Sequence, residues 1–354
     1  MGKINIVKYP PRETWERVTK RPGGGASDLD RVCETIFEEV RREGDEALRR
    51  YTRHFDRARP EFLEVTGEEF EEAARETPAA LREAILLARA RVERFHVLQA
   101  PREDVTIHDH GIRCWQETRP IERVGLYVPG GSAPLFSTVV MLVVPARLAG
   151  CREIALCTPP RPDGKVHPAI AWSARACGAT RLYKVGGVQA IAAMTFGTES
   201  IRRVDKILGP GNAFVTAAKQ RASTLGVAID MPAGPSELMV VADETADPRF
   251  VAADLLSQAE HGPDSQVFLV TSEEYLPERV EAELERQARA LPRGEIIERA
   301  LGTSTCVVLR DREECADFIN SYAPEHLMLS VKDSAWWIPL VQHAGSVFIG
   351  NYSP

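Results

Sequence analysis

Hydrophobic residues recur at helical spacing through the first hundred residues. Gly44 interrupts this pattern and predicts a helix that is divided or bent at that point. A second helix is predicted to begin at Thr66-Gly-Glu-Glu69, a capping-box pattern, and a long helix to follow over 81–95. The apolar positions that define the two helical regions are Val32, Ile36, Val40, Ala47, Leu48 and Tyr51, and then Leu81, Ile85, Ala88, Val92 and Phe95.

The pattern changes at Arg123, where short apolar runs begin to alternate with helical segments. This βαβ rhythm predicts an α/β protein with parallel sheets and covering helices, and two sheets of about five strands are more plausible than one of ten. We expect a helical N-terminal arm (1–24), a discontinuous outer domain (25–123 plus 234–354) and an inserted domain (124–233). The predicted strands are 124–128, 154–158, 181–185, 204–208, 227–230, 238–242, 266–270, 305–309, 327–331 and 347–349.

Charge and composition exclude several classes of protein. The 44 Lys and Arg against 51 Asp and Glu give a net charge of −7, without the basic footprint of a nucleic-acid binder. The longest apolar candidate, Val139 to Val144, ends at Pro145 and is far too short to span a membrane. The first 20 residues lack the apolar core of a secretion signal, and the seven cysteines form no CxxC pair. We therefore expect a cytoplasmic protein with reduced thiols and neither nucleic-acid nor membrane partners.

Two clusters offer side chains for chemistry. In the first, Gln258 and His261 are three residues apart at the end of a predicted helix, so an amide oxygen and an imidazole share one face. Two ligands do not make a metal site, and a plain helix C-terminus with Gly262 as its stop explains the same residues.

The second cluster is Glu325 and His326, where Pro324 stops a helix before a strand. A histidine beside a carboxylate offers two proton carriers with different intrinsic pKa values. A surface glutamate and a capping histidine are the structural alternative.

Glycine-rich turns follow several predicted strands. Gly209-Pro-Gly-Asn212 lies between a strand and a helix, where backbone N–H groups can face an anion, although tight turns made for packing look the same. None of these turns fits the GxGxxG dinucleotide fingerprint. In the turn that ends in Ser236 and Glu237, Ser236 is placed to donate to a ligand, while either residue is equally suited to cap the turn.

Taken together and in this order, the segments closely resemble the histidinol dehydrogenase family. The resemblance runs from the N-terminal arm to the last residue and includes several long motifs. They are Val124-Gly-Leu-Tyr-Val-Pro-Gly-Gly131, Gly209-Pro-Gly-Asn212, Ile229-Asp-Met-Pro-Ala-Gly-Pro-Ser-Glu237, Asp254-Leu-Leu-Ser-Gln-Ala-Glu-His261, Ala323-Pro-Glu-His-Leu327 and His343-Ala-Gly-Ser-Val-Phe-Ile-Gly-Asn-Tyr-Ser-Pro354.

The resemblance implies two Rossmann-like domains without GxGxxG, and a homodimer with a shared active site that oxidises L-histidinol to L-histidine with NAD and one zinc ion per subunit. By position, Gln258 and His261 match zinc ligands, and Glu325 and His326 match the acid/base pair. Ser236, Gln258, His261 and His326 match substrate-contacting positions, and Tyr127, Gln189 and Asn212 match positions that touch NAD.

The family pattern continues beyond the Tyr-Ser-Pro that ends at Pro354, with a tail that supplies a carboxylate ligand, a histidine ligand and a substrate-binding glutamate. We therefore expect a C-terminally truncated chain with two of four zinc ligands and negligible activity alone. Two alternatives stay open at this point. One is a paralogue that oxidises another polar alcohol, such as a sulfonated diol, and the other is a non-catalytic fragment.

Overall fold

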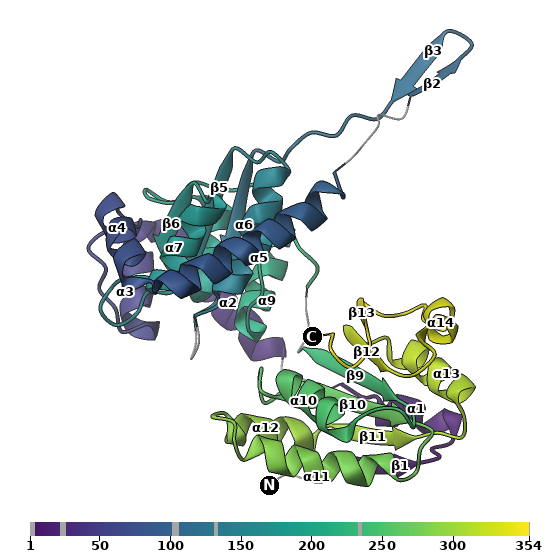
Figure 1. Ribbon diagram of the computed structural model, residues 1–354. Helices are drawn as coiled ribbons and strands as arrows, with labels where there is room; N and C mark the ends of the chain where they lie inside the picture. Colours follow the sequence, from purple (N-terminus) through teal and green to yellow (C-terminus); the bar gives the residue numbers. More distant parts are fainter. Residues whose placement is uncertain (1–3, 22–25, 101–105, 131–133, 233–235, 354) are drawn as a thin grey trace. The chain divides into compact units, whose positions relative to one another are not determined.

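The protein forms two compact units, each described here by itself. The computed structural model describes residues 4–21, 26–100, 106–130, 134–232 and 236–353. Unit 1 consists of residues 1–24 and 234–354, and unit 2 of residues 25–233 (Figure 1).

Unit 1 is built on a six-stranded sheet in the order β1-β11-β10-β9-β12-β13, in which every neighbouring pair is parallel. Without the edge strand β1, the five others follow the order 3-2-1-4-5 found in doubly wound nucleotide-binding folds. The strands are β1 (Asn5–Lys8), β9 (Glu237–Ala242), β10 (Gln266–Thr271), β11 (Thr305–Val308), β12 (His326–Ser330) and β13 (Ser346–Ile349).

Helices cover both faces of this sheet because alternate strand residues point to opposite sides. Val240 and Leu269 pack in one core, while Met239 and Phe268 pack in the other. The first core includes α10 (Pro248–Ala259), α11 (Leu276–Ala288) and α12 (Gly294–Gly302); the second includes α1 (Trp15–Val18), α13 (Arg312–Tyr322) and α14 (Ser334–Trp337), with η1 (Arg12–Thr14) and η2 (Ile338–Leu340) as short 3₁₀ turns.

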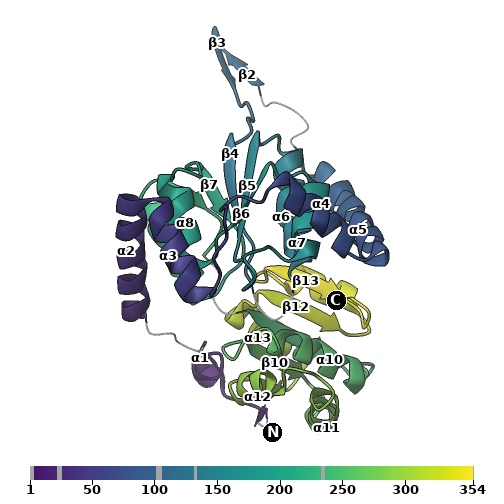
Figure 2. The same ribbon diagram turned by 90° about the vertical axis from the view of Figure 1, so that its left-hand side faces the viewer.

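Unit 2 repeats the same plan with a five-stranded parallel sheet in the order β6-β5-β4-β7-β8. The strands are β4 (Arg123–Tyr127), β5 (Glu153–Thr158), β6 (Arg181–Lys184), β7 (Lys206–Leu208) and β8 (Ala228–Ile229). Figure 2 shows helices on both sides of the sheet. One core contains α2 (Ala26–Glu43), α3 (Asp45–Phe55), α8 (Gly187–Phe196) and α9 (Ala213–Thr224); the other contains α4 (Gly67–Glu76), α5 (Ala79–Val97), α6 (Phe136–Leu148) and α7 (Pro168–Cys177).

The α/β class, the parallel sheets and all ten predicted strands are confirmed, with strand ends shifted by one or two residues. Gly44 adopts φ +55° and separates α2 from α3, as the interrupted periodicity predicts. The capping box is also present: Thr66 Oγ1 accepts from the Glu69 N–H at 3.3 Å, and the Thr66 N–H donates to the Glu69 carboxylate at 2.8 Å.

The division of the chain differs from the predicted one. Residues 25–123 group with 124–233 rather than with 234–354, because α2 and α3 pack on α8 and α9, and α5 packs on α6. The N-terminal arm belongs to unit 1, where β1 extends the sheet by pairing with β11. The predicted boundary after Ala233 agrees with the observed one, although 233–235 lie outside the described residues.

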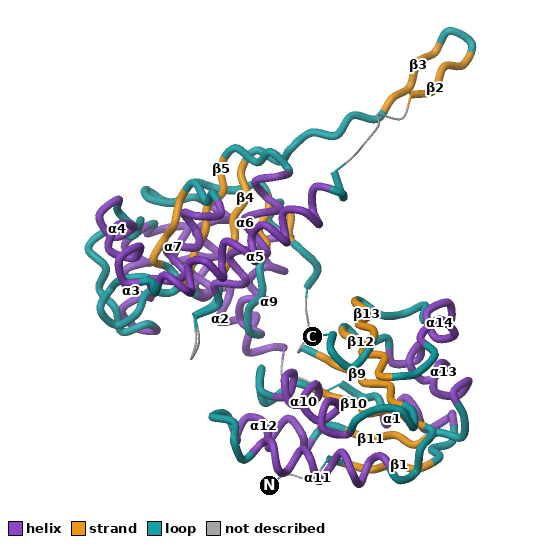
Figure 3. Tube along the Cα trace, in the orientation of Figure 1, coloured by secondary structure: helices purple, strands orange, loops and turns teal. Residues whose placement is uncertain are grey.

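A short antiparallel hairpin was not expected from the sequence. Strands β2 (Thr106–Asp109) and β3 (Ile112–Trp115) pair through a turn in which His110 and Gly111 have positive φ. Figure 3 shows these two strands in orange. Among the helices in the described part of the chain, none combines the length and apolarity needed to cross a membrane.

Candidate active site

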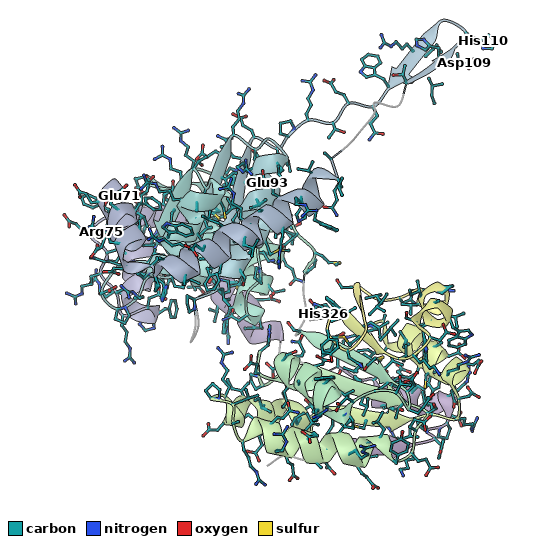
Figure 4. The ribbon with its side chains drawn as sticks, viewed as in Figure 1. Glu71, Arg75, Glu93, Asp109, His110 and His326 are labelled. Atoms are coloured by element: carbon teal, nitrogen blue, oxygen red, sulfur yellow. The ribbon has the colours of Figure 1, made fainter. Side chains whose placement is uncertain are left out.

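The amino ends of β9 and β12 lie side by side in unit 1, with His326 in register with Leu238. Helix α13 ends before Ala323, which has the left-handed φ of +55°, and Pro324 prevents the helix from continuing. Glu325 and His326 therefore enter β12 at the edge of the sheet where the strands begin, the edge at which Figure 4 labels His326. On the other side, Gly345 allows the chain before β13 to approach, since a Cβ there would lie 2.7 Å from the Glu325 carbonyl oxygen.

The backbone of Glu237 contacts both members of the Glu325–His326 pair. Its N–H donates to Glu325 Oε2 at 3.2 Å, and its carbonyl oxygen lies 3.0 Å from His326 Nδ1. A carbonyl oxygen only accepts, so Nδ1 carries a proton, and in the neutral form of the ring the lone pair is on Nε2. His326 Nδ1 also lies 3.7 Å from Glu325 Oε2. Both side chains remain partly exposed, His326 by 33% and Glu325 by 46%, which leaves them open to a substrate.

Gln258 and His261 lie at the same edge of the sheet, at the C-terminal end of helix α10. Helix α10 runs back from the end of β9 to the start of β10, so its C-terminus lies where the parallel strands begin. The His261 N–H donates to the Gln258 carbonyl at 3.1 Å and closes the final turn. The Gln258 side chain is buried, and its Nε2 has no hydrogen-bond partner among the described residues; His261 is exposed.

Ser236 links the two clusters along this edge. Its carbonyl accepts from the Gln266 N–H at 3.3 Å, and the neighbouring Ser265 N–H donates to Gly262, the residue after His261. The structure thus brings Ser236, Glu325 and His326 around the start of β9, with Gln258 and His261 at the adjoining helix end.

Gln258 and His261 are residue types that can bind a metal ion, but two ligands are too few for a metal site. The amide oxygen of Gln258 and the imidazole of His261 are types of group that can bind zinc, yet zinc sites in proteins have three or four protein ligands. Within the described ranges, no group of three His, Cys, Asp or Glu residues is placed to hold a metal ion.

The residues expected to touch NAD lie in unit 2. Tyr127 ends β4 and is buried, which raises its pKa to about 12, and its hydroxyl accepts from the Gly187 N–H at the start of α8 at 3.0 Å. Gln189, also buried, has an Oε1 without a partner among the described residues. Strands β5 and β7 flank β4, so the order of the sheet reverses there, and in such folds ligands bind beyond the carboxyl ends of the strands at this point.

The turn of Gly209 to Asn212 lies at the same position, after β7. Gly209 has φ +132°, and a Cβ on it would lie 2.2 Å from the Tyr127 carbonyl oxygen. Asp230 accepts from the Gly209 N–H at 2.7 Å, and Asn212 Oδ1 caps α9 by accepting from the Val215 N–H at 3.1 Å. The N–H groups of Gly209 in the turn and of Val215 in α9 are therefore used within the protein, and an anion would have to bind others.

One residue at the candidate site has a role that sequence reasoning missed. Glu237 was considered only as a turn cap, but its buried carboxylate forms an ion pair with Arg21. In the sequence, the local indication of a buried ion pair here is an acidic residue at the start of an otherwise apolar strand.

Comparison with known proteins agrees with this architecture. The model of the histidinol dehydrogenase family matches residues 19–354. A histidinol dehydrogenase from Bacteroides fragilis is 51% identical over 351 residues, which cover 99% of this chain and 82% of that protein. One from Bacteroides thetaiotaomicron is 48% identical, with the same two coverages. The crystal structure of histidinol dehydrogenase from Elizabethkingia anophelis matches with a TM-score of 0.96 and 48% identity, over 100% of this chain and 82% of that chain.

Similarity of this degree over nearly the whole length means that the protein is an enzyme of the histidinol dehydrogenase family.

Proposed function

We propose that the enzyme oxidises L-histidinol to L-histidine through the aldehyde, with two hydride transfers to NAD and one zinc ion per subunit. The observation that carries this proposal is the hydrogen bond between His326 Nδ1 and the Glu237 carbonyl, which leaves Nε2 free to accept a proton. Oxidation of an alcohol needs a base for the hydroxyl proton as hydride leaves, and a neutral imidazole suits that role near pH 7.

Glu325 is proposed to serve the second oxidation. The aldehyde must be hydrated before it can lose another hydride, and a carboxylate can accept a proton from the attacking water. The Glu325 carboxylate is partly exposed and held by the Glu237 N–H, so it is oriented while it still reaches solvent.

Gln258 and His261 are proposed to hold the zinc ion. The same two residues, together with Ser236 and His326, are also proposed to contact the substrate. When bound, the metal would fix the imidazole and amine of histidinol and so orient the carbinol. Zinc sites in proteins have three or four protein ligands, so further ligands would have to join these two.

Tyr127, Gln189 and Asn212 are proposed to bind NAD, which takes up the hydride. Their place at the reversal of strand order in unit 2 supports this assignment. We further propose a cytoplasmic homodimer with a shared active site, and L-histidinol rather than nucleic acid or membrane as the partner.

The stoichiometry of NAD reduction tests the function directly. The intact enzyme should form two NADH per L-histidinol, and Glu325→Gln should lower the yield toward one because the aldehyde is no longer hydrated efficiently. A panel of alcohols that includes a sulfonated diol distinguishes a paralogue. Faster oxidation of an alcohol without a metal-binding ring, or a wild-type yield of one NADH, would count against the proposal.

A further inference from the structure

Glu237 contacts the acid/base pair through its backbone and Arg21 through its side chain. The Glu237 residue is only 7% exposed at the start of β9. Arg21 Nε donates to Oε1, and Nη2 donates to Oε2 at 2.9 Å, so the pairing is bidentate. A carboxylate buried to this extent is stable when it is paired and hydrogen-bonded.

Arg21 is itself held by the end of α13. Its Nη2 lies 3.0 Å from the carbonyl oxygen of Tyr322 and 3.3 Å from that of Ala323. The guanidinium carbon stacks over the Tyr322 ring, 4.6 Å from the centroid. The Tyr322 hydroxyl donates to Gln266 Oε1 at 3.0 Å at the start of β10.

The guanidinium therefore joins the beginning of β9 to the connection that leads into β12. These are the two backbone segments from which the site is built, because Glu325 and His326 follow Ala323 and Pro324 directly. A shift of either segment would separate His326 Nδ1 from the Glu237 carbonyl, a hydrogen bond that weakens steeply once its distance or angle departs from the usual range.

We infer that the Arg21–Glu237 ion pair is a positioning device that fixes the tautomer of His326 and the orientation of Glu325. Neither side chain is required to touch the substrate; both act through the backbone of Glu237. The kinetic part of this inference rests on the proposed function, whereas the tautomer of His326 can be measured without turnover.

The structural test uses three variants of the protein. Arg21→Met removes the guanidinium, Glu237→Gln keeps the shape of the side chain without its charge, and Arg12→Met is the matched control. Arg12 lies in the same N-terminal segment and pairs with Asp317 on the surface, away from Glu237. With ¹⁵N-labelled histidine at a pH where the ring is neutral, the ring nitrogen shifts report which nitrogen of His326 is protonated.

Wild type and Arg12→Met should show His326 as the Nδ1–H tautomer. Arg21→Met and Glu237→Gln should show a mixture with the Nε2–H form. A pure Nδ1–H tautomer in both substituted chains would overturn the inference. Glu237→Gln keeps the test valid if Arg21→Met fails to fold, which circular dichroism would show.

Kinetics of the intact enzyme supply the second readout. Arg21→Met should lower kcat about 10-fold with little change in KM and should alter the pH profile of kcat/KM, because the base is misplaced rather than the substrate lost. Arg21→Lys should recover part of the rate, since an ammonium keeps the charge but not the bidentate geometry.

Equal losses of kcat in Arg21→Lys and Arg21→Met, with an unaltered pH profile, would contradict a positioning role for the ion pair. A wild type that does not oxidise histidinol would instead refute the proposed function and leave the tautomer result standing.

Discussion

His326 Nδ1 lies 3.0 Å from the carbonyl oxygen of Glu237, on the neighbouring strand. The register of β9 and β12 brings His326 beside this carbonyl, and an oxygen that only accepts requires the proton on Nδ1. A hydrogen bond from the remote nitrogen is the usual means by which proteins choose the reactive nitrogen of a histidine. The same backbone segment holds Glu325, so one strand end orients both side chains.

If His326 is the base, His326→Ala should lower kcat of the intact enzyme by about 100-fold or more. This is the rate enhancement that general base catalysis typically contributes. The rate of NADH formation at saturating histidinol measures the effect. His343→Ala is the control, because His343 is exposed and its ring contacts the Asn320 carbonyl. A loss of less than threefold in His326→Ala would place the base elsewhere.

Gln258→Ala should weaken the retention of zinc, since it removes the amide oxygen that is proposed as a ligand. Zinc content per subunit after dialysis of the intact enzyme should fall well below that of the wild type. Ser257→Ala on the same helix is the control, as its exposed hydroxyl donates to the Asp254 carbonyl. Equal zinc content in the two variants would exclude Gln258 as a ligand.

The sequence predicted the central strands well because they are buried in parallel sheets and almost wholly apolar, as in Val267 to Val270. It did not predict β1, whose four residues Asn5–Lys8 gain their structure only by pairing with β11. It also assigned residues 25–123 to the wrong unit. Amphipathic periodicity shows that a helix has an apolar face, but it does not show which sheet that face covers.

The candidate site was predictable residue by residue only through the family resemblance. Spacing alone placed Gln258 and His261 on one turn, and the topology of unit 1 then placed them at the edge of Glu325 and His326. Arg21 had no such signal. It lies 216 residues from its partner Glu237, and no local pattern links two residues that far apart.

In unit 2, a buried lysine holds the turn that is proposed to bind NAD. Lys219 Nζ donates to the Gly209 carbonyl at 2.7 Å and to Asp230 Oδ1 at 2.5 Å, with 3% of its side chain exposed. Lys219→Met should therefore destabilise the protein by about 2–3 kcal/mol, because Asp230 keeps its charge without a positively charged partner. Urea unfolding measures the stability loss, and NAD binding should weaken with it.

Lys206→Met is the control for Lys219→Met, since Lys206 lies on β7 in the same unit and is only half-buried. The double variant Lys219→Met/Asp230→Asn should lose less stability than Lys219→Met, because it leaves no unpaired charge. An equal or greater loss in the double variant would show that the lysine acts by packing alone.

Asp56, the residue after α3, gives the protein a predictable pH dependence. Burial raises the pKa of its carboxyl to about 6, and Oδ2 has no hydrogen-bond partner in the described part of the chain. An unfolded aspartate titrates near pH 3.9, so the folded state favours the neutral acid. The stability that this preference provides is fully present below about pH 4 and is lost as the pH rises through about 6.

Asp56→Asn mimics the neutral form of the carboxyl. At pH 8 it should raise the free energy of unfolding by about 1 kcal/mol, a value reduced to allow for the partial exposure of Asp56 to solvent. At pH 4 it should leave the free energy of unfolding nearly unchanged. Urea titrations at the two pH values measure the difference, with the exposed Glu46→Gln on the same helix as control. A gain of equal size at both pH values would show that Asp56 is not the group that titrates.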